Sequence, residues 1–145
     1  MHPSPLIAPM VALVAWSQVM MVWLYVARLP AMRRAGTDFS TLKGTTSADI
    51  ARIIPAEAQW KAHNYMHLME QPTLFYAIVL ALVLMGFDHP INQWLAWFYV
   101  GLRILHSIVQ ATYNKVGHRF ALFALSSFCL MALTVHAALY LWHHG

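Results

Sequence analysis

A long uncharged run near the start of the chain is the strongest constraint on what it can fold into. Residues 6–27 read LIAPMVALVAWSQVMMVWLYVA and contain no Asp, Glu, Lys or Arg. As an α-helix this run would be about 33 Å long, enough to cross a hydrocarbon core of about 30 Å. No basic residue precedes it, and it is too long for a signal-peptide core, so we expect it to be retained as a membrane span.

The composition of the whole chain extends this prediction. Of the 145 residues, 60% are hydrophobic and 10% are charged, whereas a soluble domain is about 45–50% apolar and about 25% charged. Too few polar side chains remain to cover a water-facing globule, which excludes a soluble domain and a disordered chain. The chain therefore reads as one integral membrane domain, 1–145.

Three further runs have the length of membrane spans. Residues 71–87 and 120–142 are free of charge, and a fourth run from Ile91 to Tyr113 is interrupted only by Arg103. The apolar residues do not alternate with a period of two, which argues against barrel strands. We predict an all-α integral membrane protein, a four-transmembrane-helix bundle with approximate spans 6–28, 58–87, 91–113 and 119–142.

The basic residues predict the orientation of this bundle. Eight of the nine lie in or beside the connections 29–57 and 114–118, and they are Arg28, Arg33, Arg34, Lys43, Arg52, Lys61, Lys115 and Arg119. The positive-inside rule makes both connections cytoplasmic and puts both termini outside. The basic loop is expected to attract anionic membrane lipid, and no nucleic-acid partner is expected.

Ionisable residues in or near the predicted spans are the candidate functional residues, because burying them in a membrane is costly. His63, His67 and Glu70 follow at i, i+4 and i+7 and share one helical face. Pro72 removes one backbone donor and is expected to bend this helix. The third span carries a second polar face.

That second face consists of Arg103, His106 and Gln110 at i, i+3 and i+7. Tyr113 follows at the cytoplasmic rim, and Arg119 lies in the first turn of the fourth span. A lone arginine in lipid would be expensive, so we expect Arg103 to have a partner such as Glu70. Three helices thus direct polar side chains towards the cytoplasmic half of the membrane.

Two plain interpretations compete with a functional site. The polar residues could form a structural network between helices. Alternatively, His63, His67, Glu70 and His106 could hold zinc or iron, since imidazoles at i and i+4 with a carboxylate suit such ions. The spacing lacks the general base of a zinc-protease motif, and we expect no metal.

These features together resemble the MAPEG family, the membrane-associated proteins of eicosanoid and glutathione metabolism. The resemblance rests on four spans, a carboxylate at the start of the second, R-x-x-H-S at 103–107 and an arginine opening the fourth. The stretch NYMHLMEQPTLFYA at 64–77 is similar to bacterial members, which implies a bacterial inner-membrane location. The resemblance covers roughly residues 6–142.

The resemblance implies a homotrimer with sites between protomers on the cytoplasmic side. In catalytic members glutathione binds there as co-substrate, and an arginine of the fourth span stabilises its thiolate for transfer to an apolar electrophile or reduction of a peroxide. Carried over to this chain, Arg119 is the catalytic residue. The glutathione-binding candidates are Glu70, His67, Arg103 and His106, together with His63, Gln110 and Tyr113.

The chain also departs from its glutathione-using relatives. Met66, His67 and Gln110 stand where those relatives have Arg, Asn and Tyr, while Phe120 and Phe123 replace Ser and Tyr of some members. Several hydrogen-bond donors to the tripeptide are therefore missing. The alternative function is a non-catalytic membrane scaffold, or a protein that binds lipid or another hydrophobic ligand, on the same fold.

The predicted orientation can be tested with reporter fusions. A reporter at residue 45 should be active only as a cytoplasmic reporter, and one at residue 145 only as an external reporter, because the basic loops are retained inside. Equal activity of either reporter type at both positions would contradict this topology.

Overall fold

The uncharged runs form long α-helices in the computed structural model, which describes residues 3–38, 40, 43–44 and 46–144. The helices are α1 (Ile7–Arg34), α2 (Ser47–Ala51), α3 (Ala56–Leu68), α4 (Gln71–Leu84), α5 (Pro90–Ala111) and α6 (Val116–His144). No strand occurs among the described residues. The predicted all-α class is confirmed.

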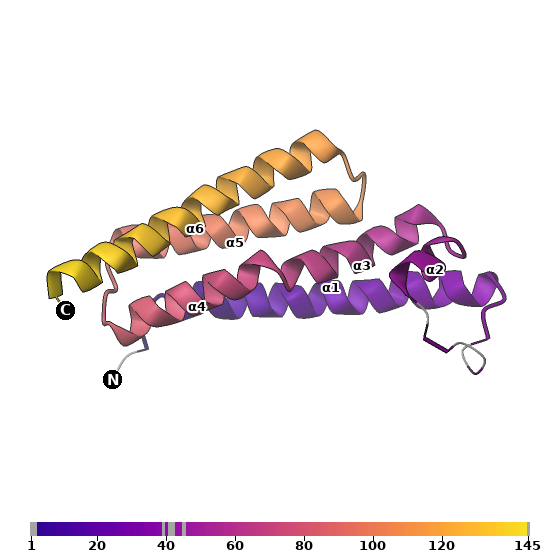
Figure 1. Ribbon diagram of the computed structural model, residues 1–145, viewed down its shortest axis with the longest axis horizontal. Helices are drawn as coiled ribbons and strands as arrows, with labels where there is room; N and C mark the ends of the chain where they lie inside the picture. The colour runs from indigo at the N-terminus through magenta and orange to yellow at the C-terminus, as the bar shows by residue number, and fades with distance from the viewer. Residues whose placement is uncertain (1–2, 39, 41–42, 45, 145) are drawn as a thin grey trace.

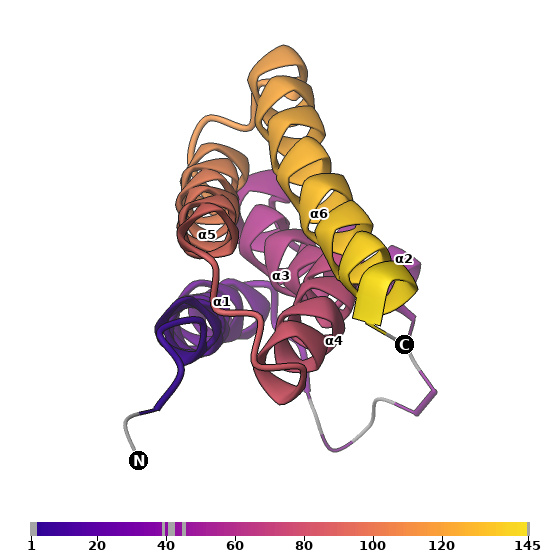
Figure 2. The same ribbon diagram turned by 90° about the vertical axis from the view of Figure 1, so that its left-hand side faces the viewer.

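The helices form two layers that run along the long axis of the molecule. One layer holds α1 beside the successive helices α3 and α4, and the other holds α5 and α6 (Figure 1). The end-on view shows α6 inclined relative to the others, so that it passes from α5 towards α4 (Figure 2). The α4–α5 connection lies at the end that holds both termini, and α2 and the α5–α6 connection lie at the opposite end.

Three segments are long and apolar enough to cross a membrane, namely Ile7–Arg34, Ala56–Leu84 and Val116–His144. They support an integral membrane protein. α5 is not among them, although its 22 residues correspond to about 33 Å of helix. The reason is its polar content, because it carries the face made by Arg103, His106 and Gln110. The predicted count of four spans is therefore not established by length and hydropathy alone.

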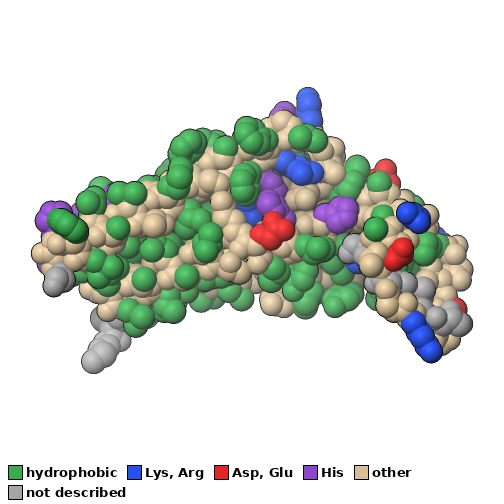
Figure 3. Space-filling view, in the orientation of Figure 1, with side chains coloured by type: hydrophobic (Ala, Val, Ile, Leu, Met, Phe, Trp, Pro, Cys, Tyr) green, Lys and Arg blue, Asp and Glu red, His purple; other side chains and the backbone are tan. Residues whose placement is uncertain are grey.

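Apolar side chains lie on the surface of the molecule as well as in its core. Many large apolar side chains are exposed, among them Val11, Val14, Leu74, Leu80, Phe128 and Val135. The interior contains buried polar side chains, including Ser17, Asn64, Asn92, Arg103, His106, Ser107, Gln110 and Ser126. Figure 3 shows apolar side chains spread over one face, with a central group of charged and histidine side chains and further charged side chains at the right-hand end. Such a surface suits lipid contact rather than water.

The structure differs from the sequence prediction at two helix boundaries. α1 continues past residue 28 to Arg34, with Pro30 inside it, and Arg33 and Arg34 lie in its last turn, where cations are favoured. Within the predicted loop 29–57, α2 forms a short helix. Met32, Ile50 and Ile54 form a small buried cluster, which holds the α2 region against α1.

A capping box starts α2. The backbone N–H and hydroxyl of Thr46 donate to Asp49 Oδ2 at 2.9 and 2.6 Å, and the Asp49 N–H donates back to the hydroxyl oxygen at 3.3 Å. These hydrogen bonds lower the pKa of the Asp49 carboxyl below its usual value of 3.8. The stabilisation is therefore present at neutral pH and is lost as the pH falls through that lowered value.

We expect Asp49→Ala to loosen α2 at neutral pH, because the box loses its acceptor. Amide hydrogen exchange across residues 47–51 should become several-fold faster. Glu57→Ala is the matched control, since Glu57 lies in the first turn of α3, outside the box. Unchanged exchange in the Asp49 variant would mean that packing alone holds α2.

Candidate functional site

The second predicted span is broken at Glu70. α3 ends at Leu68 and α4 begins at Gln71, with Pro72 in its first turn. The backbone of Glu70 has φ −91° and ψ −100°, far from the helical ψ of about −42°. Since proline is favoured in the first turn of a helix, Pro72 starts a new helix here instead of only bending the old one.

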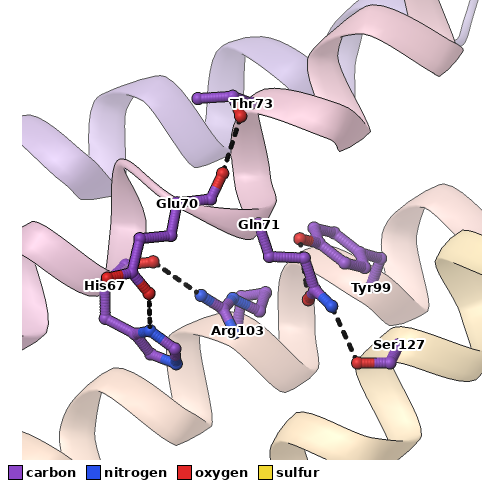
Figure 4. Close-up of polar contacts among 7 residues, drawn as sticks. All are labelled: His67, Glu70, Gln71, Thr73, Tyr99, Arg103 and Ser127. Carbon is purple, nitrogen blue, oxygen red and sulfur yellow. Dashed lines mark hydrogen bonds and ion pairs between the residues drawn. The ribbon is translucent and has the colours of Figure 1, made fainter.

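Arg103 stabilises this break from the neighbouring helix. Its Nη2 donates to the backbone carbonyl oxygen of His67 at 3.1 Å, and its side chain is almost wholly buried. The cation thus lies at the C-terminal end of α3, where the helix dipole is negative. Figure 4 shows the guanidinium reaching from α5 to the broken turn.

The expected pairing of Arg103 with Glu70 is wrong. Glu70 instead pairs with His67, whose Nδ1 lies 2.6 Å from Oε2, and no ion pair joins Arg103 to an acid within the described ranges. At the break, the His67 carbonyl accepts both the Glu70 backbone N–H at 3.4 Å and the Arg103 guanidinium. The Glu70 side chain points outwards instead, where it is 65% exposed.

Further polar contacts tie the start of α4 to the other layer. Gln71 Nε2 donates to the Ser127 hydroxyl at 2.8 Å, and the Tyr99 hydroxyl lies 3.4 Å from Gln71 Oε1. The Thr73 hydroxyl donates to the Glu70 carbonyl at 2.6 Å. Gln71 and the Glu70 carbonyl therefore find partners within the bundle (Figure 4), as a membrane interior requires.

Two cavities adjoin the break and share His67 and Arg119. One, of about 240 Å³, is lined by His63, Met66, His67, Glu70, Gln110 and Arg119. The other, of about 230 Å³, is lined by His67, His106, Val116, Arg119, Phe120 and Phe123. The first is the more polar of the two, and the second has an aromatic wall. Residues from α3, α5 and α6 thus surround one space.

Aromatic rings build the inner wall. His67 stacks on Phe123 with ring centroids 5.4 Å apart and lies 5.1 Å from His106. The Arg103 guanidinium lies 5.7 Å from the centroid of the Phe123 ring, within the range of cation–π attraction. Phe123 therefore contacts the His67 imidazole and the Arg103 guanidinium through its ring face. A residue with a hydroxyl at this position would offer these groups a hydrogen bond instead.

Arg119 is held by the turn that precedes α6. Its Nη1 donates to Asn114 Oδ1, and Asn114 has a positive φ of 52°, a conformation that Asn tolerates better than most residues. Tyr113 is exposed and its hydroxyl contacts His118 Nδ1 at 3.1 Å. Tyr113 is not part of the lining of the two cavities beside Glu70.

The sequence reasoning missed Asn64 as a polar residue of the interior. Asn64 is wholly buried, and neither end of its amide has a hydrogen-bond partner. The same holds for the Ser107 hydroxyl, Gln110 Oε1, and Nε and Nη1 of Arg103. Asn64 and His67 are three residues apart and so lie on the same side of the helix, and this spacing could have marked Asn64 as a candidate. In the described part of the chain no three His, Cys, Asp or Glu side chains are arranged to hold a metal ion.

An apolar exterior and membrane-length helices define an α-helical integral membrane protein, in which polar side chains gather at a helix break. The sequence profile of the MAPEG family matches residues 6–139, and the chain belongs to the MAPEG family. Among curated proteins and among solved structures, no significant match to this chain was found.

The role of Arg103 at the break can be tested by Arg103→Met, which keeps the bulk of the side chain. We expect a loss of about 2 kcal/mol in stability, because a hydrogen bond to a charged donor disappears where no water replaces it. Thermal unfolding in detergent would measure it. Arg34→Met, at an exposed helix end, should have little effect; equal melting temperatures for both variants would contradict the assignment.

Proposed function

We propose that this protein binds glutathione at the cavities beside Glu70 and acts as a glutathione-dependent transferase or peroxidase on apolar electrophiles. The observation that carries the proposal is the shared lining of these cavities. One carboxylate, three imidazoles and the Arg119 guanidinium surround a space that continues onto the apolar side chains of Phe120 and Phe123.

The charges of the cavity suit a tripeptide with an amine and two carboxylates. Glu70 supplies the acceptor for a cationic amine, and Arg119 supplies donors for an anion. The Nε of Arg119 is buried without a partner, and a buried donor of this kind gains most from an incoming acceptor. His63, His67 and Gln110 complete the polar lining.

Arg119 is the residue we assign to thiol activation. Glutathione supplies a thiol that acts as the nucleophile once it is deprotonated. A guanidinium in a site with little water favours the charged sulfur and so lowers the pKa of a bound thiol. Asn114, which accepts a hydrogen bond from Nη1, acts as a positioning residue because it limits the directions in which the guanidinium can point.

The electrophile would occupy the aromatic side. Phe120 is 71% exposed and stands beside Phe123 at the edge of the second cavity, where an apolar molecule can arrive from the lipid. The electrophile and the thiol are thereby brought to one place, which accounts for much of the rate gain in such bimolecular reactions.

We further propose a homotrimer in the bacterial inner membrane, with the loops 29–57 and 114–118 cytoplasmic and both termini outside. α4 spans about 21 Å from Gln71 to its end, so in this orientation Glu70 lies inside the cytoplasmic side of the membrane. A carboxylate left exposed there would be costly. A neighbouring protomer that covers Glu70 removes this cost and closes the site.

One observation favours a second candidate function. Phe120 and Phe123 occupy the cavity wall next to Arg119, and Arg119 already donates to Asn114. A site of this composition also suits an apolar ligand that is bound without reaction. The protein would then be a scaffold or a lipid-binding protein.

Glutathione binding and turnover separate the two functions. Millimolar glutathione should raise the melting temperature of the detergent-purified protein, with a gain of about 2.7 kcal/mol at a hundredfold excess over Kd. Arg119→Ala should lower thiol transfer to a model electrophile by at least about a hundredfold, because the thiolate loses its counter-charge.

Arg52→Ala is the control, since Arg52 is exposed in the loop after α2, and it should keep full activity. No thermal shift together with no turnover would overturn the enzyme proposal in favour of the scaffold. A shift without turnover would retain glutathione as a ligand and remove the reaction.

A further inference from the structure

A third cavity is lined by residues from the start of α5 and the end of α6. These segments lie at the end of the bundle opposite α2 (Figure 1). The volume of the cavity is about 480 Å³, within the range of small-molecule sites. It is lined by Phe87, His89, Ile91, His136, Leu139, Tyr140, His143 and His144. Four imidazoles therefore line one cavity that the proposed glutathione chemistry does not use.

The protein's own hydrogen bonds determine which ring nitrogen of each histidine is available. Nδ1 of His143 lies 2.7 Å from the Leu139 carbonyl oxygen, and Nδ1 of His144 lies 2.9 Å from that of Tyr140. A carbonyl oxygen only accepts, so both Nδ1 atoms carry a proton. In their neutral forms both rings leave Nε2 as a free acceptor.

His136 also carries its proton on Nδ1, and here the acceptor is the side-chain amide of Asn92. Asn92 Nδ2 donates to the Phe87 carbonyl at 3.2 Å, which orients its amide. Asn92 Oδ1 is then the acceptor that lies 2.8 Å from His136 Nδ1. This ring is therefore also protonated at Nδ1 and free at Nε2.

His89 differs from the other three histidines, because its Nδ1 is a hydrogen-bond acceptor. Its Nδ1 accepts the Ile91 backbone N–H at 3.2 Å and caps the start of α5. The neutral ring therefore carries its proton on Nε2 and already offers a donor.

A histidine protonated on both ring nitrogens presents two N–H donors and a positive charge. When His136, His143 and His144 gain a proton, each keeps its Nδ1 hydrogen bond and each gains an Nε2–H donor. Histidine is the side chain whose charge changes between pH 5 and 8. No acidic side chain lines the cavity. Asp88, which precedes His89, accepts a hydrogen bond from the Ser4 hydroxyl at 2.6 Å.

The remaining lining is apolar or aromatic. Tyr140 stacks between Phe87 and His144, with centroid distances of 4.5 and 4.3 Å, and Ile91 is 51% and Leu139 51% exposed. The ligand therefore combines an anionic head with an apolar body. Four N–H donors suit the several acceptor oxygens of a phosphate group.

We propose that this cavity binds the phosphate group of an anionic phospholipid when its histidines are protonated, with the acyl chains against Ile91 and Leu139. The site is a lipid contact regulated by pH, at the end of the bundle that lacks Lys and Arg. It is independent of the glutathione site and of whether the protein is an enzyme.

The test is binding of fluorescent phosphatidylglycerol to the detergent-purified full chain, measured by anisotropy at pH 7.5 and pH 5.5. Wild-type protein should bind about tenfold more tightly at pH 5.5, the size of one charge-assisted hydrogen bond. The double variant His143→Gln/His144→Gln should lose most of this pH dependence and should fold, because both side chains are exposed at a helix end.

His136→Gln gives a second variant inside the cavity and should reduce the pH effect as well. His118→Gln, at the opposite end of α6, is the matched control and should keep the full effect. Fluorescent diacylglycerol, which has no phosphate, should show no pH effect, and millimolar inorganic phosphate should not displace phosphatidylglycerol.

Several results would overturn the proposal. If the affinity for phosphatidylglycerol fell on acidification, protonated imidazoles would not hold the phosphate. The cavity would then suit a ligand that binds neutral imidazoles, such as a metal ion. If both cavity variants kept the full pH dependence of phosphatidylglycerol binding, the lipid would bind at another site. Full displacement by inorganic phosphate would make this a site for a free anion and not for a lipid.

Discussion

The hydrogen bond from Arg103 to the His67 carbonyl is the interaction on which the rest of the structure depends. A membrane interior supplies no water to a broken helix, so each freed backbone group needs a partner from the protein. Pro72 makes the break, and the guanidinium on α5 satisfies it at the negative end of α3. The exposure of the Glu70 side chain beside α3 accompanies this arrangement.

The break also explains how a site arises in an otherwise apolar bundle. Glu70 leaves the helix and pairs with His67, whose ring in turn stacks on Phe123 from α6. The cavities next to these side chains therefore combine charge with aromatic surface. The histidine cavity at the other end of the bundle has a different chemistry, because its imidazoles are oriented by carbonyl and amide oxygens and not by a carboxylate.

Much of this arrangement could be predicted from the chain alone. The 3.6-residue period brought His63, His67 and Glu70 to one face and Arg103, His106 and Gln110 to another, and most of these residues line the two cavities. The pairing of Arg103 could not be predicted, since it depends on where the break places the His67 carbonyl relative to α5. Asn64 was missed because a lone amide in a helix resembles many solvent-exposed ones.

The sequence by itself determined the all-helical membrane class, because uncharged runs of span length have few other stable structures. It also determined the family and the end of the bundle at which the basic residues lie. Only the tertiary structure decided that Glu70 pairs with His67, that Phe123 lies against Arg103, and that four distant histidines share a cavity. The pair of Glu70 and His67 depends on the local break between α3 and α4. The other two contacts join residues of different elements, and there helix packing, not local spacing, sets which side chains meet.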